Sequence, residues 1–404
     1  MRVETPEHAS YDVVIVGGAI MGSSVAWFLA SNPDFDGRIL VVERDPSYES
    51  CSTAHTNSCI RLQFSNELNI RISQFTAGFV KNLRQHLGGD ERVPELEIQN
   101  YGYLYLADNE PFADVLRANQ KVQLAAGAET RLLTPEEIEQ NYPFYNLDDI
   151  LLGSINTRDE GYWDGGTVFE WLRRSARAQG AEYVTGEVVS MASNQDGSRI
   201  ESVTLASGAQ IACRYVVNAS GPRAALTAKM AGIDDLPVEP RKRYTWIFKA
   251  EKKLDRELPL TIDPSGVHVR QDGPETYLVG SKGTVDPAVD PTDFAMEDGL
   301  WENEVWPAIA NRIPQFEAIR VINEWTGHYA YNVLDQNAVI GPHPQIGNFL
   351  FINGFSGHGL QQSPAMGRGI AEWIIHGEFR SLDLSPFGYE RVVSGRALTE
   401  KAVI

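Results

Sequence analysis

The distribution of apolar residues near the N-terminus predicts a strand, a glycine-rich turn, a helix and a second strand. Residues 11–16 (YDVVIV) are almost wholly apolar, as in a strand buried within a parallel sheet. Glycines follow, and residues 20–31 (IMGSSVAWFLAS) have the composition of a helix with small residues near its start. Residues 38–43 (RILVVE) form a second apolar strand. The pattern predicts a β-α-β unit, in which a glycine-rich turn is informative about ligands.

The rest of the chain changes from helical to antiparallel patterns and back again. Residues 65–87 predict a long amphipathic helix, and residues 244–280 alternate as strands of an antiparallel sheet do. Residues 349–353 (FLFIN) return to the buried-strand type. This order predicts an α/β protein with interleaved domains. Further helices are expected at residues 111–126, 134–140, 165–179, 294–309 and 360–375, and further strands at residues 99–107 and on both sides of an Asp196-Gly197 turn.

Length and charge narrow the classes of function. The 404 residues, 43% of them hydrophobic, suffice for a large core and two or three domain-sized units. The 35 Lys and Arg against 54 Asp and Glu give a formal net charge of −19. Because nucleic-acid binding requires a basic surface, neither nucleic acid nor an anionic membrane surface is expected as a partner.

The cysteines and the long uncharged segment near the N-terminus indicate in which cellular compartment the protein is expected. Cys51, Cys59 and Cys213 form no C-x-x-C pair, so neither a zinc site nor a disulfide scaffold is expected. We expect no metal site and a reducing, cytoplasmic location. The first ten residues lack the features of a secretory signal. Residues 13–33 carry no charge, but glycines interrupt them, so no integral membrane span is expected.

The turn after the first strand reads Gly17-Gly18-Ala19-Ile20-Met21-Gly22. In a G-x-G-x-x-G loop the first glycine permits the turn, the second admits a pyrophosphate, and the third allows close packing of helix and strand. Ala19 replaces the second glycine here. Glu43 follows Gly22 by 21 residues, at the end of the second strand, where an acidic side chain binds an adenosine ribose. The fingerprint predicts a dinucleotide and fits NAD and FAD alike.

Further segments, in the same order along the chain, resemble the D-amino-acid oxidase (DAO) family of flavoproteins, which includes sarcosine oxidase, glycine oxidase and dimethylglycine dehydrogenase. The most specific is NFLFINGFSGHGLQQSPAMGRGIAEWI, at residues 348–374. The others are VVERDP (41–46) leading into CSTAHTNSCIRLQFS (51–65), the segment at 159–188 that begins DEGYWDGGTVFEW, YVVNASGPRA (215–224) and PVEPRKRY (237–244).

The resemblance implies a Rossmann-like FAD-binding domain interleaved with an α+β substrate domain that is built on a mixed, largely antiparallel sheet. The FAD-binding domain would comprise residues 1–90, 155–230 and 325–404, and the substrate domain residues 91–154 and 231–324. Noncovalent FAD is the expected cofactor. By resemblance its contacts are Gly17, Ala19, Ile20, Met21, Gly22, Glu43, Arg44, Ser52, Thr53, Arg61, Val188, Ala219, Gly221, Gly354, Ser356, Gly357, His358, Gly359 and Leu360.

The family reaction is amine oxidation, in which a hydride equivalent leaves the carbon next to nitrogen and enters FAD, and the imine product hydrolyses. The substrate would be a small amino acid or N-substituted amino acid, and the electron acceptor oxygen or another carrier. Its carboxylate calls for an arginine, whose planar fork suits bidentate binding. The candidates are Arg61, Arg241, Arg243 and Lys282, with Tyr329 and Tyr244 closing the pocket and His358 near the flavin. We select Arg61, Arg243, Tyr329 and His358 as the catalytic set.

Three positions depart from sarcosine oxidase. Gln361 stands where that enzyme has a lysine that helps to hold the carboxylate, and Phe64 matches its second arginine. His328 roughly matches the cysteine that tethers its flavin, so that bond cannot form here. His55, in S-T-A-H, matches the histidine through which dimethylglycine dehydrogenase attaches its flavin in S-T-W-H, which keeps a covalent alternative open.

Two other functions compete with amine oxidation. Relatives of this arrangement include assembly factors for respiratory complexes, which keep FAD but act through protein contacts. Another possibility is a dehydrogenase that passes electrons to a quinone or a flavoprotein. The sequence leaves the exact substrate, its stereochemistry and the oligomeric state open.

Overall fold

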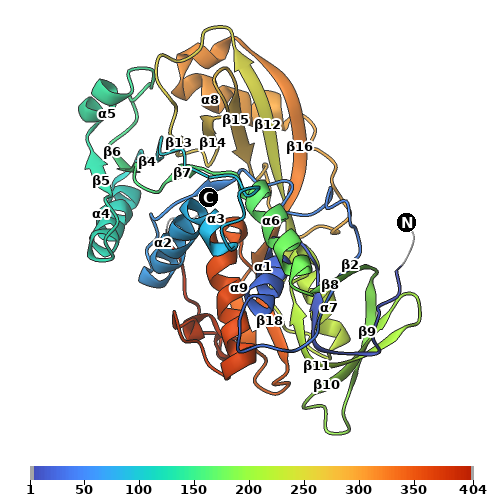
Figure 1. The fold of residues 1–404 in the computed structure, drawn as a ribbon. Helices are drawn as coiled ribbons and strands as arrows, with labels where there is room; N and C mark the ends of the chain where they lie inside the picture. Colours follow the sequence, from blue (N-terminus) through green and yellow to red (C-terminus); the bar gives the residue numbers. More distant parts are fainter. Residues whose placement is uncertain (1–3, 402–404) are drawn as a thin grey trace.

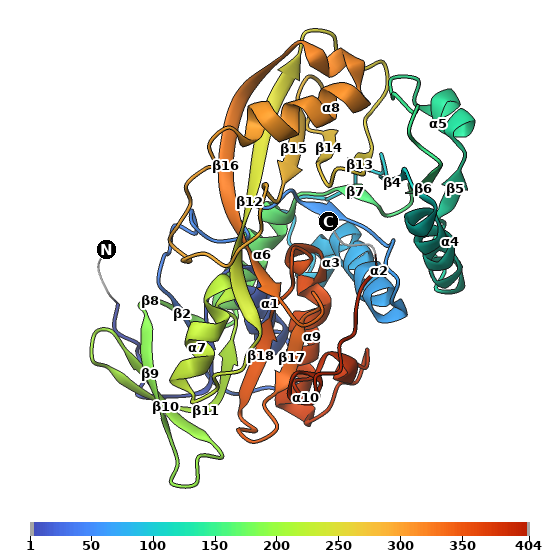
Figure 2. The same cartoon turned by 180° about the vertical axis from the view of Figure 1, so that it is seen from behind.

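The computed structural model describes residues 4–401. Residues 1–3 and 402–404 lie outside it, and with them the ends of the predicted FAD-binding domain and the start of the segment searched for a secretory signal. Two large sheets dominate the fold, one in the lower and one in the upper half of Figure 1, and Figure 2 shows them from behind. The chain crosses between the sheets several times.

The first sheet contains the predicted β-α-β unit. Its strands β1 and β2 run parallel, and β11 pairs with β1 on the other side. Strand β18 continues the parallel part, while β17 and the β9–β10 pair are antiparallel. The strands are β1 (Ser10–Val16), β2 (Ile39–Glu43), β8 (Glu182–Thr185), β9 (Val188–Ser193), β10 (Ile200–Leu205), β11 (Gln210–Asn218), β17 (Val339–Pro342) and β18 (Phe349–Asn353).

Both faces of this sheet are buried, because its central strands are apolar on both sides. Val13 and Ile15 of β1 belong to the same buried cluster as Val25 of α1 and Ile370 of α9. Val14 faces the opposite side, in a cluster that includes residues of the short helix α7. The helices of this half are α1 (Ile20–Ala30), α2 (Glu67–Lys81), α3 (Leu83–His86), α6 (Gly165–Ala178), α7 (Ala224–Met230), α9 (Gly359–His376) and α10 (Glu390–Ser394).

The second sheet is antiparallel throughout except where β13 pairs with β4. Its order is β16-β12-β15-β14-β13-β4-β6-β5. These strands are β4 (Tyr103–Ala107), β5 (Arg131–Leu133), β6 (Leu152–Asn156), β12 (Val238–Ala250), β13 (Leu260–Ile262), β14 (His268–Gln271), β15 (Tyr277–Ser281) and β16 (Ile319–Asn332). Its helices are α4 (Glu110–Ala125), α5 (Pro135–Asn141) and α8 (Trp306–Arg312), and β3 (Cys59–Ile60) pairs with β7 (Gly161–Tyr162) beside it.

The strands of the two sheets alternate along the chain, as the change of pattern indicates. Strand β6 pairs with β4 as far as Asn156, and strand β16 pairs with β12 as far as Asn332. Both strands therefore stay in the second sheet beyond the predicted domain boundaries after residues 154 and 324. The assignment of every residue to a domain stays a prediction.

Two predicted helices are shorter than their sequence patterns. The helix predicted at 65–87 is broken, because α2 ends at Lys81 and Asn82 caps it by donating Nδ2 to the Gly78 carbonyl at 2.8 Å. The helix predicted at 294–309 begins only at Trp301, as one π-helical turn that leads into α8. Gly299 has a φ of 73°, which prevents the helix from extending backwards.

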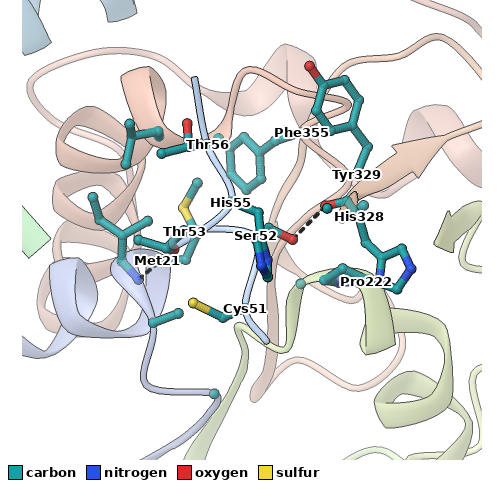
Figure 3. Close-up of a pocket in the computed structure, with 18 of the residues that line it drawn as sticks. Met21, Cys51, Ser52, Thr53, His55, Thr56, Pro222, His328, Tyr329 and Phe355 are labelled. Atoms are coloured by element: carbon teal, nitrogen blue, oxygen red, sulfur yellow. Dashed lines mark hydrogen bonds between the residues drawn. The ribbon is translucent and has the colours of Figure 1, made fainter. Parts of the chain in front are cut away.

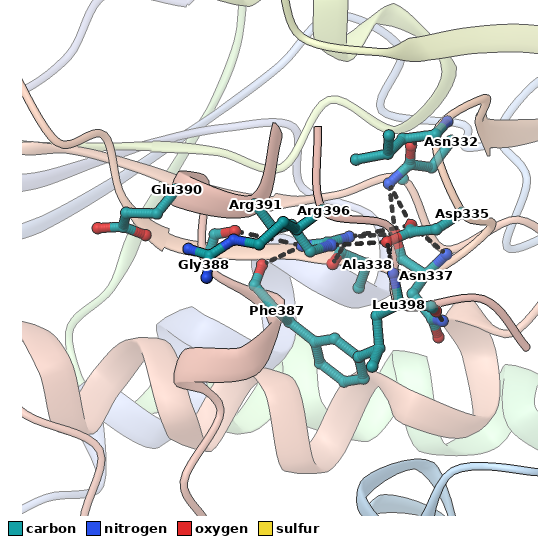
Figure 4. A network of polar contacts seen from close by, with 12 residues as sticks. Asn332, Asp335, Asn337, Ala338, Phe387, Gly388, Glu390, Arg391, Arg396 and Leu398 are labelled. Atoms are coloured by element: carbon teal, nitrogen blue, oxygen red, sulfur yellow. Dashed lines mark hydrogen bonds and ion pairs between the residues drawn. The ribbon is translucent and has the colours of Figure 1, made fainter. Parts of the chain in front are cut away.

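The C-terminal segment is anchored by a buried ion pair. Arg391 of α10 binds Asp335, in the turn between β16 and β17, through Nε at 2.8 Å and Nη2 at 3.2 Å. Figure 4 shows this network, in which Asp335 also accepts a hydrogen bond from the backbone of Leu398. The Asp335 side chain is 0% exposed. No helix in the described part of the chain is long and apolar enough to cross a membrane.

Candidate functional site

A long pocket runs from the glycine turn after β1 to one face of the second sheet. It collects residues from segments that are distant in sequence, and Figure 3 shows part of its wall. Among the predicted cofactor contacts, Gly22 and Gly354 do not line the pocket. The others do: Gly17, Ala19, Ile20, Met21, Glu43, Arg44, Ser52, Thr53, Arg61, Val188, Ala219, Gly221, Ser356, Gly357, His358, Gly359 and Leu360.

The glycines of the first turn act through close packing. Gly17 has a φ of 101°, and a β-carbon there would lie 2.5 Å from the carbonyl oxygen of Ala219. A β-carbon on Gly22 would collide with the Gly17 carbonyl, so Gly22 shapes the turn without lining the pocket. Ala19, at the N-cap of α1, makes no side-chain capping bond. The first N–H groups of this helix therefore face a site suited to phosphate.

Glu43 is fixed beside the turn. Its Oε2 accepts a hydrogen bond from the Gly18 backbone at 2.8 Å, and its Oε1 accepts one from the Asp45 backbone at 2.8 Å. Burial raises the pKa of this carboxyl. The carboxylate lies where β2 ends, in the position that dinucleotide-binding folds use for ribose hydroxyls.

Arg223 is a pocket residue that the sequence analysis missed. It follows the Ala219-Ser220-Gly221 turn, and it lines the pocket together with Arg44. Burial and then the like charge of Arg44 lower the pKa of Arg223. A half-buried cationic site of this kind suits a phosphate. The available signal was a basic residue two positions after the turn.

The loop that follows β2 bridges the two sheets. Ser52 donates its hydroxyl to the His328 carbonyl at 2.6 Å, and Thr53 accepts a hydrogen bond from the Ile20 backbone at 3.4 Å (Figure 3). His55 lies over Gly327, where a β-carbon would be 2.7 Å from that of His55. The loop therefore connects the helix that would hold phosphate to strand β16.

His55 and His328 both line the pocket but differ in the hydrogen bonds of their rings. The Nδ1 of His55 is buried, with no hydrogen-bond partner in the described structure. His328 uses its Nε2 to bind the Asp293 carbonyl at 2.7 Å, and its ring packs on Phe294. These contacts tie the segment around Asp293 and Phe294 to strand β16. Noncovalent FAD stays the prediction, and attachment through His55 stays the alternative to it.

Arg61 lies at the centre of a buried network. The residue is 1% exposed, and its guanidinium donates to the Gln63 carbonyl at 2.8 Å and to the Tyr105 hydroxyl. It also donates to Nε2 of His358 at 2.8 Å. Since an arginine only donates, this imidazole nitrogen accepts. Burial and the Arg61 charge hold the pKa of His358 well below its usual range, so the ring is neutral.

Two of the three residues that depart from sarcosine oxidase contact Arg61. Gln361 accepts a hydrogen bond from the Arg61 backbone through Oε1 at 2.9 Å. The ring of Phe64 lies 4.1 Å from the guanidinium carbon. Nearby, Glu160 is 0% exposed and accepts from the Leu62 backbone, and burial raises its pKa to about 8. Gln361 and Phe64 therefore contact Arg61 without adding a charge beside it.

Two of the four candidate carboxylate ligands lie outside the pocket. Lys282 is exposed, and Arg241 packs on Tyr331; neither residue lines the pocket. Arg243 does line it, with its guanidinium carbon 4.4 Å from the centre of the Tyr329 ring. The tyrosines Tyr329 and Tyr244 also line the pocket, as predicted from the sequence.

Asn57 and His268 form a second polar group that sequence reasoning missed. Asn57 Nδ2 lies 2.8 Å from Nε2 of His268, and Thr245 donates its hydroxyl to Asn57 Oδ1 at 3.5 Å. Burial, then the charges of Arg243 and Arg270, lower the pKa of His268 to about 4. The only signal was a polar residue between apolar ones in GVHVR. Within residues 4–401 no cluster of His, Cys, Asp and Glu is arranged to hold a metal ion.

The pocket fits an FAD molecule in its main features. The glycine cradle and the uncapped helix suit the pyrophosphate, Glu43 suits the ribose, and a second turn, at Gly354–Gly359, opens helix α9 at the far end. His358, at the N-cap of α9, makes no side-chain capping bond.

Comparison with known proteins agrees with this geometry. The family model of DAO, described as FAD dependent oxidoreductase, matches residues 12–373. The chain is 36% identical to the FAD-dependent oxidoreductase domain-containing protein 1 of Xenopus laevis, covering 99% of this chain and 85% of that protein. It is 24% identical to human mitochondrial dimethylglycine dehydrogenase, covering 100% of this chain but 47% of that enzyme.

A solved structure shows the same fold. L-Proline dehydrogenase from P. horikoshii superposes with a TM-score of 0.82 at 25% identity, covering 96% of this chain and 99% of that chain. The glycine oxidase of Geobacillus kaustophilus superposes with a TM-score of 0.78 at 21% identity, covering 94% and 98% of the two chains. On the match over residues 12–373, this chain belongs to the DAO family of FAD-dependent oxidoreductases.

Proposed function

We propose that the protein oxidises a small amino acid or N-substituted amino acid at the carbon next to nitrogen. The observation that carries the proposal is the end of the pocket beside the second sheet, where Arg61 and Arg243 both lie among tyrosines. Relatives whose names state a substrate, among them dimethylglycine dehydrogenase and L-proline dehydrogenase, act on small amino acids. A site that pairs arginines with aromatic rings suits such a carboxylate.

FAD, when bound, supplies the redox chemistry by accepting a hydride equivalent from the substrate carbon. The residues of this chain bind and orient the substrate. The positive end of α9, preceded by the Gly354–Gly359 turn, stabilises negative charge that develops beside it. Neutral His358 accepts the Arg61 hydrogen bond and adds no second positive charge next to Arg61.

Burial of the substrate end excludes water from the reacting carbon. Tyr103 and Leu260 line this end and are 5% and 1% exposed. Tyr329 closes it from strand β16, with its ring against Gly357. Burial of this kind favours the neutral form of an amine over its cation. The neutral amine is the form that can donate a hydride equivalent.

The proposal is tested by anaerobic mixing of the purified flavoprotein with a panel of amines. The panel contains N-methylglycine, N,N-dimethylglycine, iminodiacetate, proline, glycine and D-amino acids, and the readout is bleaching of flavin absorbance. We expect at least one N-alkyl amino acid to reduce the flavin. If none of them bleaches it, the enzymatic proposal is wrong, and a role through protein contacts takes its place.

Two further measurements define the cofactor and the acceptor. Acid precipitation releases a noncovalent flavin into the supernatant, whereas a His55 tether leaves it on the protein; we expect release. Peroxide formed in air during turnover identifies oxygen as the acceptor. Turnover that requires an added quinone or dye identifies a dehydrogenase.

A further inference from the structure

A long loop whose residues are all exposed or half-buried follows β15. It runs from Gly283 to Gly299, just before the π-helical turn that leads into α8, and we call it the strap. Both glycines have left-handed backbones, with φ of 86° and 73°. Glu297 accepts a hydrogen bond from the Thr284 backbone at 3.4 Å, which brings the two ends of the strap together. The strap is therefore closed at its base, as an Ω-loop is, with a glycine at each end.

The middle of the strap forms part of the wall of the pocket. Pro291 lines the pocket directly. The ring centre of Phe294 lies 4.3 Å from that of His328 and 5.8 Å from that of His55, and both histidines line the pocket. This part of the strap therefore covers the region in which the loop after β2 meets strand β16.

Asp290 extends this cover toward the basic residues that suit a phosphate. Hydrogen bonds from Thr292, and then the charge of Arg223, lower the pKa of the Asp290 carboxyl. Arg223 lines the pocket on the side of the glycine turn. The strap thus reaches from His328 to the neighbourhood of Arg223, across the site that fits FAD.

Polar contacts to strand β12 hold the strap in place. Lys242 binds the Asp293 carboxylate at 2.7 Å and donates to the Ala295 carbonyl at 3.0 Å. Asp286 accepts a hydrogen bond from Arg243 at 2.7 Å. The Lys242 and Asp293 side chains are 13% and 43% exposed. Water can therefore replace these contacts when the strap moves away from the sheet.

The backbone of the strap is only weakly joined to the sheet. Within residues 4–401, the single backbone-to-backbone hydrogen bond between them runs from the Val289 N–H to the Pro240 carbonyl at 2.9 Å. Segments with few buried apolar contacts and few backbone bonds open locally at a low cost in free energy. The glycines at the two ends can absorb the change in backbone angles. The strap can therefore open while both sheets stay folded.

We propose that the strap is a lid over the FAD site, which opens to let FAD enter and leave and which the Lys242–Asp293 ion pair holds closed. The ligand follows from the family of the chain, so the inference does not depend on which substrate is oxidised. A lid of this kind sets the rate at which the cofactor exchanges and contributes no group to the reaction.

The test compares the exchange of FAD with the opening of the strap in Lys242→Met. The holoprotein is incubated with excess isotopically labelled FAD, and mass spectrometry follows the labelled fraction that becomes bound. Hydrogen exchange of the peptide that contains Val289 reports opening of the strap in the same sample. Removal of a partly exposed ion pair shifts such an equilibrium by about fivefold. We expect both rates to rise by about this factor, because both follow the fraction of molecules with an open strap.

Lys249→Met is the matched control. Lys249 lies on the same strand and pairs with Glu275 at 3.2 Å, but neither residue lines the pocket or contacts the strap. We expect both rates to stay within about twofold of the parent values. Asp293→Asn, which removes the same ion pair from the side of the strap, should accelerate both rates as Lys242→Met does, and it serves if that variant folds poorly.

The inference is overturned if Lys242→Met opens the strap faster but exchanges FAD at the parent rate, since the strap would then move without gating the site. It is also overturned if neither rate changes, or if Lys249→Met accelerates both equally. Absence of FAD exchange in the parent and in both strap variants would likewise overturn it. Failure of the proposed function has a different signature, because no amine would bleach the flavin while the exchange rates would still differ between variants.

Discussion

The side-chain amide of Asn57 occupies space that a side chain on Gly280 would need. A β-carbon on Gly280 would lie 3.3 Å from Asn57 Nδ2 and would collide with the ring of His268. Thr245, Gly280 and His268 stand in one row across strands β12, β15 and β14. Asn57 spans the row above the glycine, between Thr245 and His268. A loop of the first half of the molecule thereby completes a face of the second sheet.

Gly280→Ala should disrupt this row. The added methyl group displaces the His268 ring and the Asn57 amide, and overpacking of this kind costs about 1–3 kcal/mol of unfolding free energy. Chemical denaturation measures the loss. Gly78→Ala is the control, because no atom lies within 4 Å of a β-carbon there. In the helix α2 it should stabilise the protein by about 0.5–1 kcal/mol. Equal stability of Gly280→Ala and the parent would contradict the packing argument.

Arg223→Ala should weaken FAD binding. Removal of a half-buried guanidinium from a phosphate site costs about 1.5–3 kcal/mol, which is a rise of about tenfold or more in Kd. The fluorescence of flavin released on dilution measures this Kd. Arg214→Ala, an exposed arginine of β11 outside the pocket, should leave it unchanged. If both variants retain FAD equally, Arg223 does not contact the cofactor.

Glu160 should make the stability of the protein depend on pH. Its folded-state pKa is raised by burial to about 8, while the unfolded carboxyl ionises near its ordinary value. Between these values the folded state binds the extra proton, so the free energy of unfolding falls as pH rises, by on the order of a few kcal/mol. This stability is fully present below the unfolded pKa and is lost as pH rises through the folded pKa.

Urea unfolding at a series of pH values measures the effect of Glu160. In Glu160→Gln the amide oxygen still accepts the Leu62 N–H, but no proton is exchanged, so the slope between about pH 5 and pH 8 should flatten. A slope equal to that of the parent would show that other groups cause it.

Arg391→Met should be among the most destabilising single substitutions. It leaves Asp335 charged and buried without its partner, and the expected loss is about 3–5 kcal/mol in chemical denaturation. Asp335→Asn combined with Arg391→Met removes both charges and should lose less than Arg391→Met alone. A double variant that is less stable than the single one would show that the carboxylate stabilises the turn independently of Arg391.

The local pattern of apolar residues was enough to predict the positions of the regularly buried strands and helices. The apolar strands β1, β2 and β18 and the helices α1, α4 and α9 lie within a few residues of their predicted positions. Buried strands need apolar residues on both faces, and a glycine turn leaves a fixed spacing, so both can be recognised locally. The predicted helices at 65–87 and 294–309 were too long because a polar cap and a left-handed glycine ended them.

The sequence by itself determined the family and the dinucleotide turn, and most of the cofactor contacts it predicted line the pocket, because these depend on spacing within short segments. Only the tertiary structure decided how the basic residues are used. It separated Arg243 from Arg241 and Lys282, committed Arg61 to His358, and brought Asn57 to His268. The physical reason is that the partner of a charge or an amide lies far away in sequence: Asp286 is 43 residues from Arg243, and His268 is 211 residues from Asn57.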